Sequence, residues 1–304
     1  MGSWRQIAPL PGPREAAAAV FHGGKAYLFG GDATSDGIEA YQNNTWIYDP
    51  AGNTWTTGAV LPTNGLCYAF STADDGIHVV FIRSGNHYAY DPTTNTWATR
   101  TAAPGPGRLQ AFHFVDSSGR FYLAGGSQLG GQTSTEVYRY DPVTDGWATR
   151  AAMPSALADF PTTAPGVLGT DNKVYLGRGS LVSTLLVYDP ATDTWTTSPV
   201  MPDNRAFYPT VSRLPAGTII TLPHRTLPTS GGNTLTRRID GYTPGVGWAM
   251  GVTPDYPGVV HAAAVATEPG GVIYLLGGTY QNADGYAFAV TDCWAYKQND
   301  PPLV

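Results

Sequence analysis

A small set of side chains in this sequence could exchange protons with a substrate near neutral pH. His224, His261, Asp159 and Tyr208 are the expected catalytic residues, and Glu15 is a further candidate. Histidine has an ordinary pKa close to neutral pH, and carboxyl or phenol groups become acids or bases when their surroundings shift their pKa values. For His261, a structural role bonded to a neighbouring element is an equally open interpretation.

A second set of candidates could bind an anion or a polarised oxygen. The expected substrate-binding residues are Arg83, Arg178, Arg225, Arg205, Arg108, Arg14, Gln128, Phe160, Phe207 and Tyr280. The guanidinium group offers a planar fork of donors that matches the paired oxygens of carboxylate, phosphate or enolate. The arginines therefore predict a cationic pocket in an acidic chain. The alternative, in which an arginine at a strand end pairs with a neighbouring Asp or Glu, stays open.

Several familiar catalytic patterns are missing from the sequence. It contains no HExxH, no HxH and no GxSxG, and its two cysteines, Cys67 and Cys293, fit no zinc spacing. Glycine pairs such as Gly125-Gly126 fall at turns between strands rather than before a helix that could cradle phosphate. We therefore expect no cofactor and no metal, although ligands from distant segments could still converge.

The elements that must position these side chains appear in a repeat. Tyr-Asp-Pro occurs four times, and each Tyr is followed seven residues later by a Trp; the Tyr–Trp pairs are Tyr48–Trp55, Tyr90–Trp97, Tyr140–Trp147 and Tyr188–Trp195. A degenerate fifth copy runs from Tyr242 to Trp248. Each copy predicts a hairpin, because Pro fixes the turn and Asp or Asn caps its backbone. The repeated Tyr and Trp are expected to be structural, as are His78 and His113.

Two further strands precede each hairpin, so every unit is expected to be a four-stranded antiparallel sheet. A Gly-Gly doublet ends the second strand in three units, at residues 30–31, 125–126 and 277–278. Trp4 belongs to the same series, yet no strands precede it, and the last unit stops at Trp294-Ala295-Tyr296 without its final Trp strand. The segment 3–11 is therefore predicted to complete the last sheet and close a ring.

In these features the sequence resembles the kelch-repeat β-propellers along nearly its whole length. The doublets, the Tyr and the Trp carry the resemblance, at a spacing near the ~50 residues typical of kelch repeats. It implies an all-β, six-bladed propeller in one domain, 1–304, with blades near 12–62, 63–104, 105–154, 155–202, 203–254 and 255–298 plus the closing strand. Sialate mutarotases are similar stand-alone kelch propellers. The iron-binding pattern of nitrile-specifier proteins and the copper site of galactose oxidase are not reproduced.

The resemblance also implies where a ligand binds. One face is built from loops that lead into each blade, carrying Glu15, Arg108, Asp159, Tyr208 and His261, and from loops after the doublet position. Three units replace the doublet by Arg83, by Arg178 and by His224-Arg225. Long insertions at Asp32–Asn44, Arg225–Thr236 and Thr279–Ala289 belong to neighbouring blades and could form a partial lid.

Composition narrows the classes of partner. The 304 residues carry 17 Lys+Arg against 23 Asp+Glu, a net charge of −6, which argues against a nucleic-acid binder. No apolar run reaches the ~18 residues needed to cross a membrane, and the first residues do not resemble a signal peptide. We expect a cytoplasmic protein, or a secreted one if a signal peptide has been removed. No segment resembles a protein-partner domain.

Two functions from different classes fit these observations. The first is a cofactor-free enzyme of isomerase or cyclase type that converts a small carbonyl-containing or anionic substrate in the central pocket. The second is a non-catalytic module that binds acidic peptides or a small ligand, like the kelch domains of ubiquitin-ligase adaptors. The lid-like insertions favour the enzyme.

Overall fold

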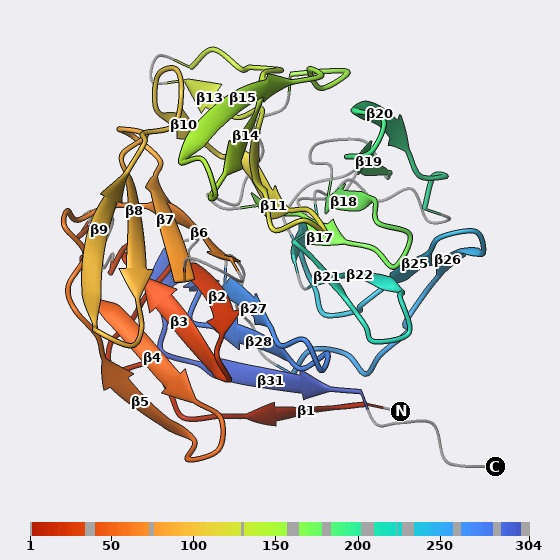
Figure 1. Cartoon of the computed structure of the whole chain (residues 1–304). Helices are drawn as coiled ribbons and strands as arrows, with labels where there is room; N and C mark the ends of the chain where they lie inside the picture. Colours follow the sequence, from red (N-terminus) through yellow and green to blue (C-terminus); the bar gives the residue numbers. More distant parts are fainter. Residues whose placement is uncertain are drawn as a thin grey trace.

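The computed structural model describes residues 2–33, 40–72, 76–128, 131–156, 164–177, 184–201, 210–222, 224–226, 234–257, 263–281 and 287–298. Every regular element in these ranges is a β-strand. The strands form six sheets of four antiparallel strands arranged around a ring (Figure 1). The predicted all-β, six-bladed architecture is confirmed.

Each blade uses four strands in order from the centre of the ring to its rim (Figure 1). Blade 1 contains β2 (Ala18–His22), β3 (Lys25–Phe29), β4 (Thr45–Asp49) and β5 (Thr54–Thr57); blade 2 contains β6 (Cys67–Thr72), β7 (Gly76–Phe81), β8 (His87–Asp91) and β9 (Thr96–Arg100). Blade 3 contains β11 (Phe112–Val115), β12 (Phe121–Ala124), β14 (Val137–Asp141) and β15 (Gly146–Arg150). Blade 4 contains β17 (Val167–Leu168), β18 (Val174–Gly177), β19 (Leu185–Asp189) and β20 (Thr194–Thr197). Blade 5 contains β21 (Val211–Arg213), β22 (Ile219–Thr221), β25 (Gly241–Thr243) and β26 (Gly247–Ala249). Blade 6 contains β27 (Ala264–Thr267), β28 (Ile273–Leu276), β31 (Cys293–Lys297) and β1 (Ser3–Gln6).

Short strand pairs accompany the blades. The insertions of blades 5 and 6 begin and end as two-stranded ribbons, β23 (His224–Thr226) with β24 (Thr234–Thr236) and β29 (Thr279–Gln281) with β30 (Ala287–Ala289). In blade 3, β10 (Arg108–Leu109) pairs with β13 (Ser127–Gln128), and β16 (Ala164–Pro165) runs parallel to β11. These ribbons extend the second strands at one end of the propeller.

The N-terminal strand closes the ring. Strand β1 pairs with β31 in an antiparallel register that sets Ser3 opposite Lys297 and Gln6 opposite Trp294. The Trp4 indole also donates a hydrogen bond of 3.1 Å to the Pro254 carbonyl, which leads from blade 5 into blade 6. The predicted closure by the first residues is therefore confirmed.

One hydrogen-bond unit explains the repeated Tyr and Trp. At the seam between blades 1 and 2, Trp97 Nε1 donates to the Ala59 carbonyl at 3.1 Å, and the Ala59 amide donates to Asn95 Oδ1 at 2.6 Å. The buried Tyr90 hydroxyl donates to the same Asn95 oxygen at 2.7 Å. The same unit recurs with Tyr48, Asn53, Trp55 and Ala8, with Tyr140, Asp145, Trp147 and Thr101, and with Tyr188, Asp193, Trp195 and Ala151. The Trp and Tyr therefore have the expected structural role.

The degenerate fifth copy departs from this unit in a consistent way. The Asn or Asp of the complete copies adopts a positive φ of 48° to 56°, a conformation these residues tolerate better than most. In blade 5 the turn is one residue shorter, because Gly247 pairs with Thr243 and directly precedes Trp248, and the turn residues Pro244, Gly245 and Val246 offer no side chain that could accept a hydrogen bond. Trp248 donates instead to the Pro199 carbonyl at 2.8 Å, and proline has no amide that needs an acceptor.

The Gly-Gly doublets let backbone segments approach each other closely. A Cβ on Gly31 would lie 2.7 Å from the Glu15 carbonyl oxygen, and one on Gly30 would lie 2.5 Å from the Gly65 carbonyl oxygen of the next blade. Blade 2 has no doublet, and here the glycine lies on the other side of the seam. A Cβ on Gly107 would lie 2.0 Å from the Arg83 carbonyl oxygen, so Arg83 is accommodated by a glycine in blade 3.

Candidate functional site

The polar groups of interest lie at the end of the propeller where the first strand of a blade begins and the second ends, which we call the mouth end. In blade 1, Glu15 precedes β2 and Asp32 follows β3. Their backbones exchange two hydrogen bonds, from the Glu15 amide to the Asp32 carbonyl at 2.8 Å and from the Asp32 amide to the Glu15 carbonyl at 2.9 Å. The antiparallel pairing of β2 and β3 thus places two carboxyl-bearing residues directly opposite each other.

Glu15 is a carboxyl group at this end whose pKa is shifted upward. Burial raises the pKa of Glu15, and the negative charge of Asp32 raises it further, whereas a hydrogen bond from the Thr279 hydroxyl of blade 6 acts in the opposite direction. That hydroxyl donates to Glu15 Oε2 across the seam between blades 6 and 1. A carboxyl group with a raised pKa beside a second carboxyl group is an arrangement suited to acid–base chemistry.

Asp32 is the more buried member of the pair, with 7% of its surface exposed. Its Oδ1 accepts a hydrogen bond of 2.7 Å from the Ala40 amide, where the insertion of blade 1 returns to the sheet. The backbone of Asp32 also pairs with Tyr41. Asp32, at the start of the insertion, is therefore tied to the segment where the insertion returns.

Tyr41 connects this region to blade 2. Arg83 Nη2 donates to the Tyr41 hydroxyl at 3.1 Å, and the Arg83 guanidinium carbon lies 5.7 Å from the centre of the Tyr41 ring. The Arg83 side chain is exposed, and Tyr41 is the one hydrogen-bond partner of its guanidinium within the described residues. The remaining N–H groups of Arg83 are available to bind an anion.

Thr279, Glu15, Asp32, Tyr41 and Arg83 form a continuous line of contacts, which we call the mouth track. It runs from blade 6 over blade 1 to blade 2. The track combines a carboxyl group that can exchange a proton with an exposed guanidinium that can hold a negative charge. These are the two kinds of group that were expected at the mouth of the channel.

Arg14 and Arg108, two of the expected substrate-binding residues, are buried. The Arg14 guanidinium donates to Asn44 Oδ1 at 2.9 Å and to the Pro13 carbonyl at 3.1 Å, and it lies 4.2 Å above the Trp46 ring. Burial lowers the pKa of Arg14 to about 10. This guanidinium holds the end of the blade 1 insertion, because Asn44 directly precedes β4.

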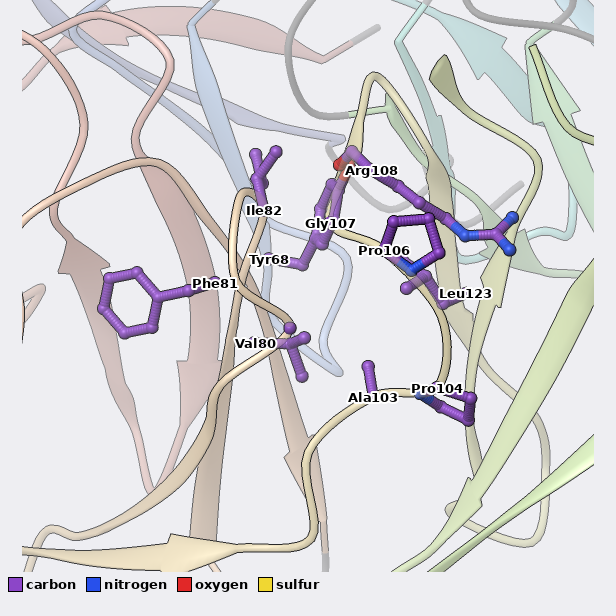
Figure 2. Close-up of a pocket in the computed structure, with 11 residues that line it drawn as sticks. Tyr68, Val80, Phe81, Ile82, Ala103, Pro104, Pro106, Gly107, Arg108 and Leu123 are labelled. Atoms are coloured by element: carbon purple, nitrogen blue, oxygen red, sulfur yellow. Dashed lines mark hydrogen bonds between the residues drawn. The ribbon is translucent and has the colours of Figure 1, made fainter. Parts of the chain in front are cut away.

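Arg108 is 2% exposed and serves blade 3 in a similar way. Its guanidinium donates to the Gly125 carbonyl and the Ser134 hydroxyl, each at 3.0 Å, and binds the Glu136 carboxylate. Arg108 also lines a cavity of about 10 Å³ between blades 2 and 3, and Figure 2 shows its guanidinium extending away from Tyr68 and Val80. A space of this size holds about one water molecule, so it is not a substrate pocket.

The other predicted site residues divide into two groups. Asp159, Phe160, Arg178, Arg205, Phe207, Tyr208 and His261 lie outside the described residues. His224 and Arg225 belong to β23 and Tyr280 belongs to β29, but their side chains also lie outside what the structure describes. Gln128 is partly buried in β13 opposite Arg108, and its backbone amide donates to the backbone carbonyl of Gln132 at 2.8 Å.

Two features of the mouth track were missed from the sequence. Tyr41 was not singled out, although it is an aromatic residue in an insertion otherwise rich in small and polar residues. The pairing of Glu15 with Thr279 also has no local signal, because 264 residues separate them. The repeat could have found this pair, since Glu15 leads into blade 1 and Thr279 follows a doublet in the blade that precedes it around the ring.

The described part of the chain shows neither a metal-binding cluster nor a membrane-spanning helix. No group of three His, Cys, Asp or Glu side chains there could hold a metal ion. The same residues include no helix long and apolar enough to span a membrane.

Comparison with known proteins agrees with this architecture. A family model described as Kelch motif matches residues 13–59. An N-acetylneuraminate epimerase from Pasteurella multocida (strain Pm70) is 34% identical over 87 residues, which are 28% of this chain and only 23% of that protein's length. The solved structure of YjhT superimposes with a TM-score of 0.72 over 94% of this chain and 95% of that chain, at 16% identity. This structural likeness establishes the fold.

Proposed function

Because the chain is a six-bladed β-propeller with a Kelch motif at residues 13–59, we propose that its mouth binds a small organic acid and that Glu15 exchanges a proton with it. The observation that supports this most directly is the raised pKa of Glu15, caused by burial and by the neighbouring Asp32 carboxylate. A carboxyl group of this kind can be protonated closer to neutral pH than an ordinary glutamate. It can then give a proton to one oxygen of a substrate and take one from another.

Within this proposal, the two halves of the mouth track have different tasks. Arg83 binds the negative charge of the substrate, and the Tyr41 hydroxyl holds the guanidinium in place at 3.1 Å. The negative charge of Asp32 beside Glu15 favours the protonated form of Glu15. The reaction at such a site causes no net gain or loss of substrate atoms, because the proton removed at one position of the substrate is returned at another.

The class of reaction that fits best is isomerisation of a hydroxy or carbonyl acid, with a sugar acid as the first candidate. The partial match to a protein named N-acetylneuraminate epimerase supports this choice. Epimerisation and the interconversion of ring forms both proceed by protonation and deprotonation of oxygen or carbon, which one carboxyl group can assist.

The exposed Arg83 also fits the second candidate, a module that binds acidic peptides without converting them. The two functions differ in what Glu15 does. Peptide binding would depend on Arg83 and would not need a protonated carboxyl group, whereas isomerisation needs both residues.

The test is a thermal-shift screen of the intact chain against sugar acids, other small carboxylates and acidic peptides. We expect a small acid to stabilise the chain, and Arg83→Gln to weaken this stabilisation. Arg5 is an exposed arginine on the rim strand β1, and Arg5→Gln should leave the stabilisation unchanged. Stabilisation by acidic peptides alone would favour the binding module. Equal stabilisation of the wild type and the Arg83→Gln variant would contradict the role of the mouth track.

A further inference from the structure

We propose that Thr279 is a positioning residue that holds Glu15 Oε2, so that Oε1 is the oxygen that exchanges the proton with the substrate. The inference rests on the proposed function, because it assigns a task to a second residue at the same site. Thr279 does not have to touch the substrate. It acts through the carboxyl group of Glu15.

The first support is the contact itself and its burial. Thr279 begins β29 and has 1% of its surface exposed, and its hydroxyl donates to Glu15 Oε2. A buried hydroxyl that has a partner loses that bond only at a cost, because no water can replace it. The contact is therefore a fixed feature of the seam between blades 6 and 1.

The second support is the backbone that surrounds the contact. The Gly278 amide donates to the Arg14 carbonyl at 2.7 Å, and the Arg14 amide donates to the Val290 carbonyl at 3.0 Å. The Val290 amide returns to the Gly278 carbonyl at 2.9 Å. The residues directly before Glu15 and directly before Thr279 are thus bonded to each other, which leaves their side chains little freedom to separate.

The third support is that Glu15 is held both by its backbone and by its side chain. The Glu15 backbone is held to Asp32 by two hydrogen bonds, while its carboxyl group is held by Thr279. Among the described residues, the charge that acts on this carboxyl is that of Asp32, which favours its protonated form, and the buried Arg14 interacts in turn with Asp32. The Thr279 hydroxyl is the donor that favours the ionised form.

The chemical consequence concerns the location of the proton. Thr279 donates its single hydroxyl proton to Oε2, so Oε2 is the acceptor of this hydrogen bond. The transferable proton then resides on Oε1. One carboxyl oxygen is used for orientation and the other for chemistry, which fixes the direction of proton transfer.

The test compares Thr279→Val, which keeps the shape and removes the donor, with Thr279→Ser, which keeps the donor. The Glu15 carboxyl group is titrated by carbon NMR in the intact chain. We expect an upward shift of its titration midpoint in the valine variant and a wild-type midpoint in the serine variant. Thr221→Val changes an equally buried threonine in blade 5 and should leave the midpoint unchanged.

If the valine variant does not fold, Thr279→Cys keeps a weaker donor and is expected to give an intermediate midpoint. An unchanged Glu15 midpoint in a folded valine or cysteine variant overturns the role of Thr279, even if wild-type chain converts a substrate. A shifted midpoint that serine restores, in a chain that neither binds nor converts any small acid, supports the orientation of Glu15 and contradicts the proposed function alone. The pH dependence of turnover should shift in the same direction as the Glu15 midpoint.

Discussion

His78 Nδ1 and His87 Nε2 lie 2.9 Å apart inside blade 2, where both imidazoles are buried. His87 Nδ1 lies 3.1 Å from the Thr101 carbonyl oxygen, which can only accept, so this nitrogen carries the proton. His87 Nε2 is then the acceptor and His78 Nδ1 the donor. Because Thr101 also accepts from Trp147 of blade 3, the histidine pair is part of the seam between these blades.

The histidine pair predicts acid sensitivity. Burial lowers the pKa of His78 to about 4 and that of His87 to about 3, and the charges of Arg100 and Asp145 act on both rings. In the unfolded chain both rings bind protons near pH 6.5. The unfolding free energy is therefore unaffected above pH 6.5 and falls by roughly 3 kcal/mol or more as the pH drops to 4.

The measurement is denaturant unfolding of wild type and His78→Asn/His87→Asn between pH 7 and 4. The variant should be less stable at pH 7 but show a flatter pH dependence. The buried His113, with a pKa lowered to about 3 by burial, is present in both proteins and cancels in the comparison. Parallel curves for the two proteins would refute the prediction.

Asn95 should be critical for the seam between blades 1 and 2. Replacement by Ala removes the acceptor for the Ala59 amide and the Tyr90 hydroxyl. It also places an alanine at a backbone φ of 56°, which alanine tolerates less well than asparagine. We expect a loss of about 2–3 kcal/mol in unfolding free energy. Asn95→Asp is the matched control and should be nearly neutral, because blades 3 and 4 use Asp145 and Asp193 at this position. Equal losses in both variants would contradict the acceptor role.

Trp4 should contribute strongly to closure of the ring. Its ring centre lies 5.1 Å from that of Tyr256 and 5.2 Å from that of Tyr296, and its indole N–H donates to the Pro254 carbonyl. Trp4→Ala is expected to lower the unfolding free energy by about 3 kcal/mol, and removal of residues 1–11 should also reduce the cooperativity of unfolding. The check is a denaturant titration followed by two spectroscopic probes. Unchanged midpoint and slope in the truncated chain would be incompatible with closure by β1.

The arginines should separate into two classes by a paired comparison. Arg108→Met removes a buried guanidinium and leaves Glu136, Ser134 and the Gly125 carbonyl without their donor, so we expect a loss of roughly 3 kcal/mol in stability. Arg83→Gln changes an exposed side chain and should alter stability by less than about 0.5 kcal/mol while weakening binding of a small acid. Thermal unfolding and ligand titration of both variants check this. A loss of stability in Arg83→Gln together with a loss of ligand binding in Arg108→Met would contradict the structural role of Arg108 and the binding role of Arg83.

The fold could be predicted because its determinants are local and repeated. The Tyr, the turn residue and the Trp of one hairpin lie within seven residues of each other and recur around the ring. Even the closure by Trp4 could be inferred, because the first and last units had complementary defects. Gly107 shows the limit of such reasoning, since it compensates for a missing doublet from the opposite side of a seam, and nothing in the sequence around it marks that role.

The site was predictable only in outline. The mouth end and the two sets of loops followed from the family resemblance, but the burial of Arg14 and Arg108 did not. Each of these arginines binds a side-chain oxygen from a segment about 30 residues away, Asn44 for Arg14 and Glu136 for Arg108, and nothing in the sequence around them marks this. The Glu15–Thr279 contact forms only when blade 6 is placed against blade 1 by the closed ring.

The most direct test of proton exchange at the mouth is exchange NMR of a sugar acid whose ring forms interconvert slowly, with N-acetylneuraminate as the first choice. The wild-type chain should accelerate the interconversion, Glu15→Gln should abolish the acceleration, and Arg83→Gln should weaken it through poorer binding. Glu268→Gln, a partly buried glutamate after β27 at the opposite end of the propeller, should behave like the wild type. Full acceleration by the Glu15→Gln variant, or none by the wild type with any small acid tested, would contradict a catalytic role for Glu15.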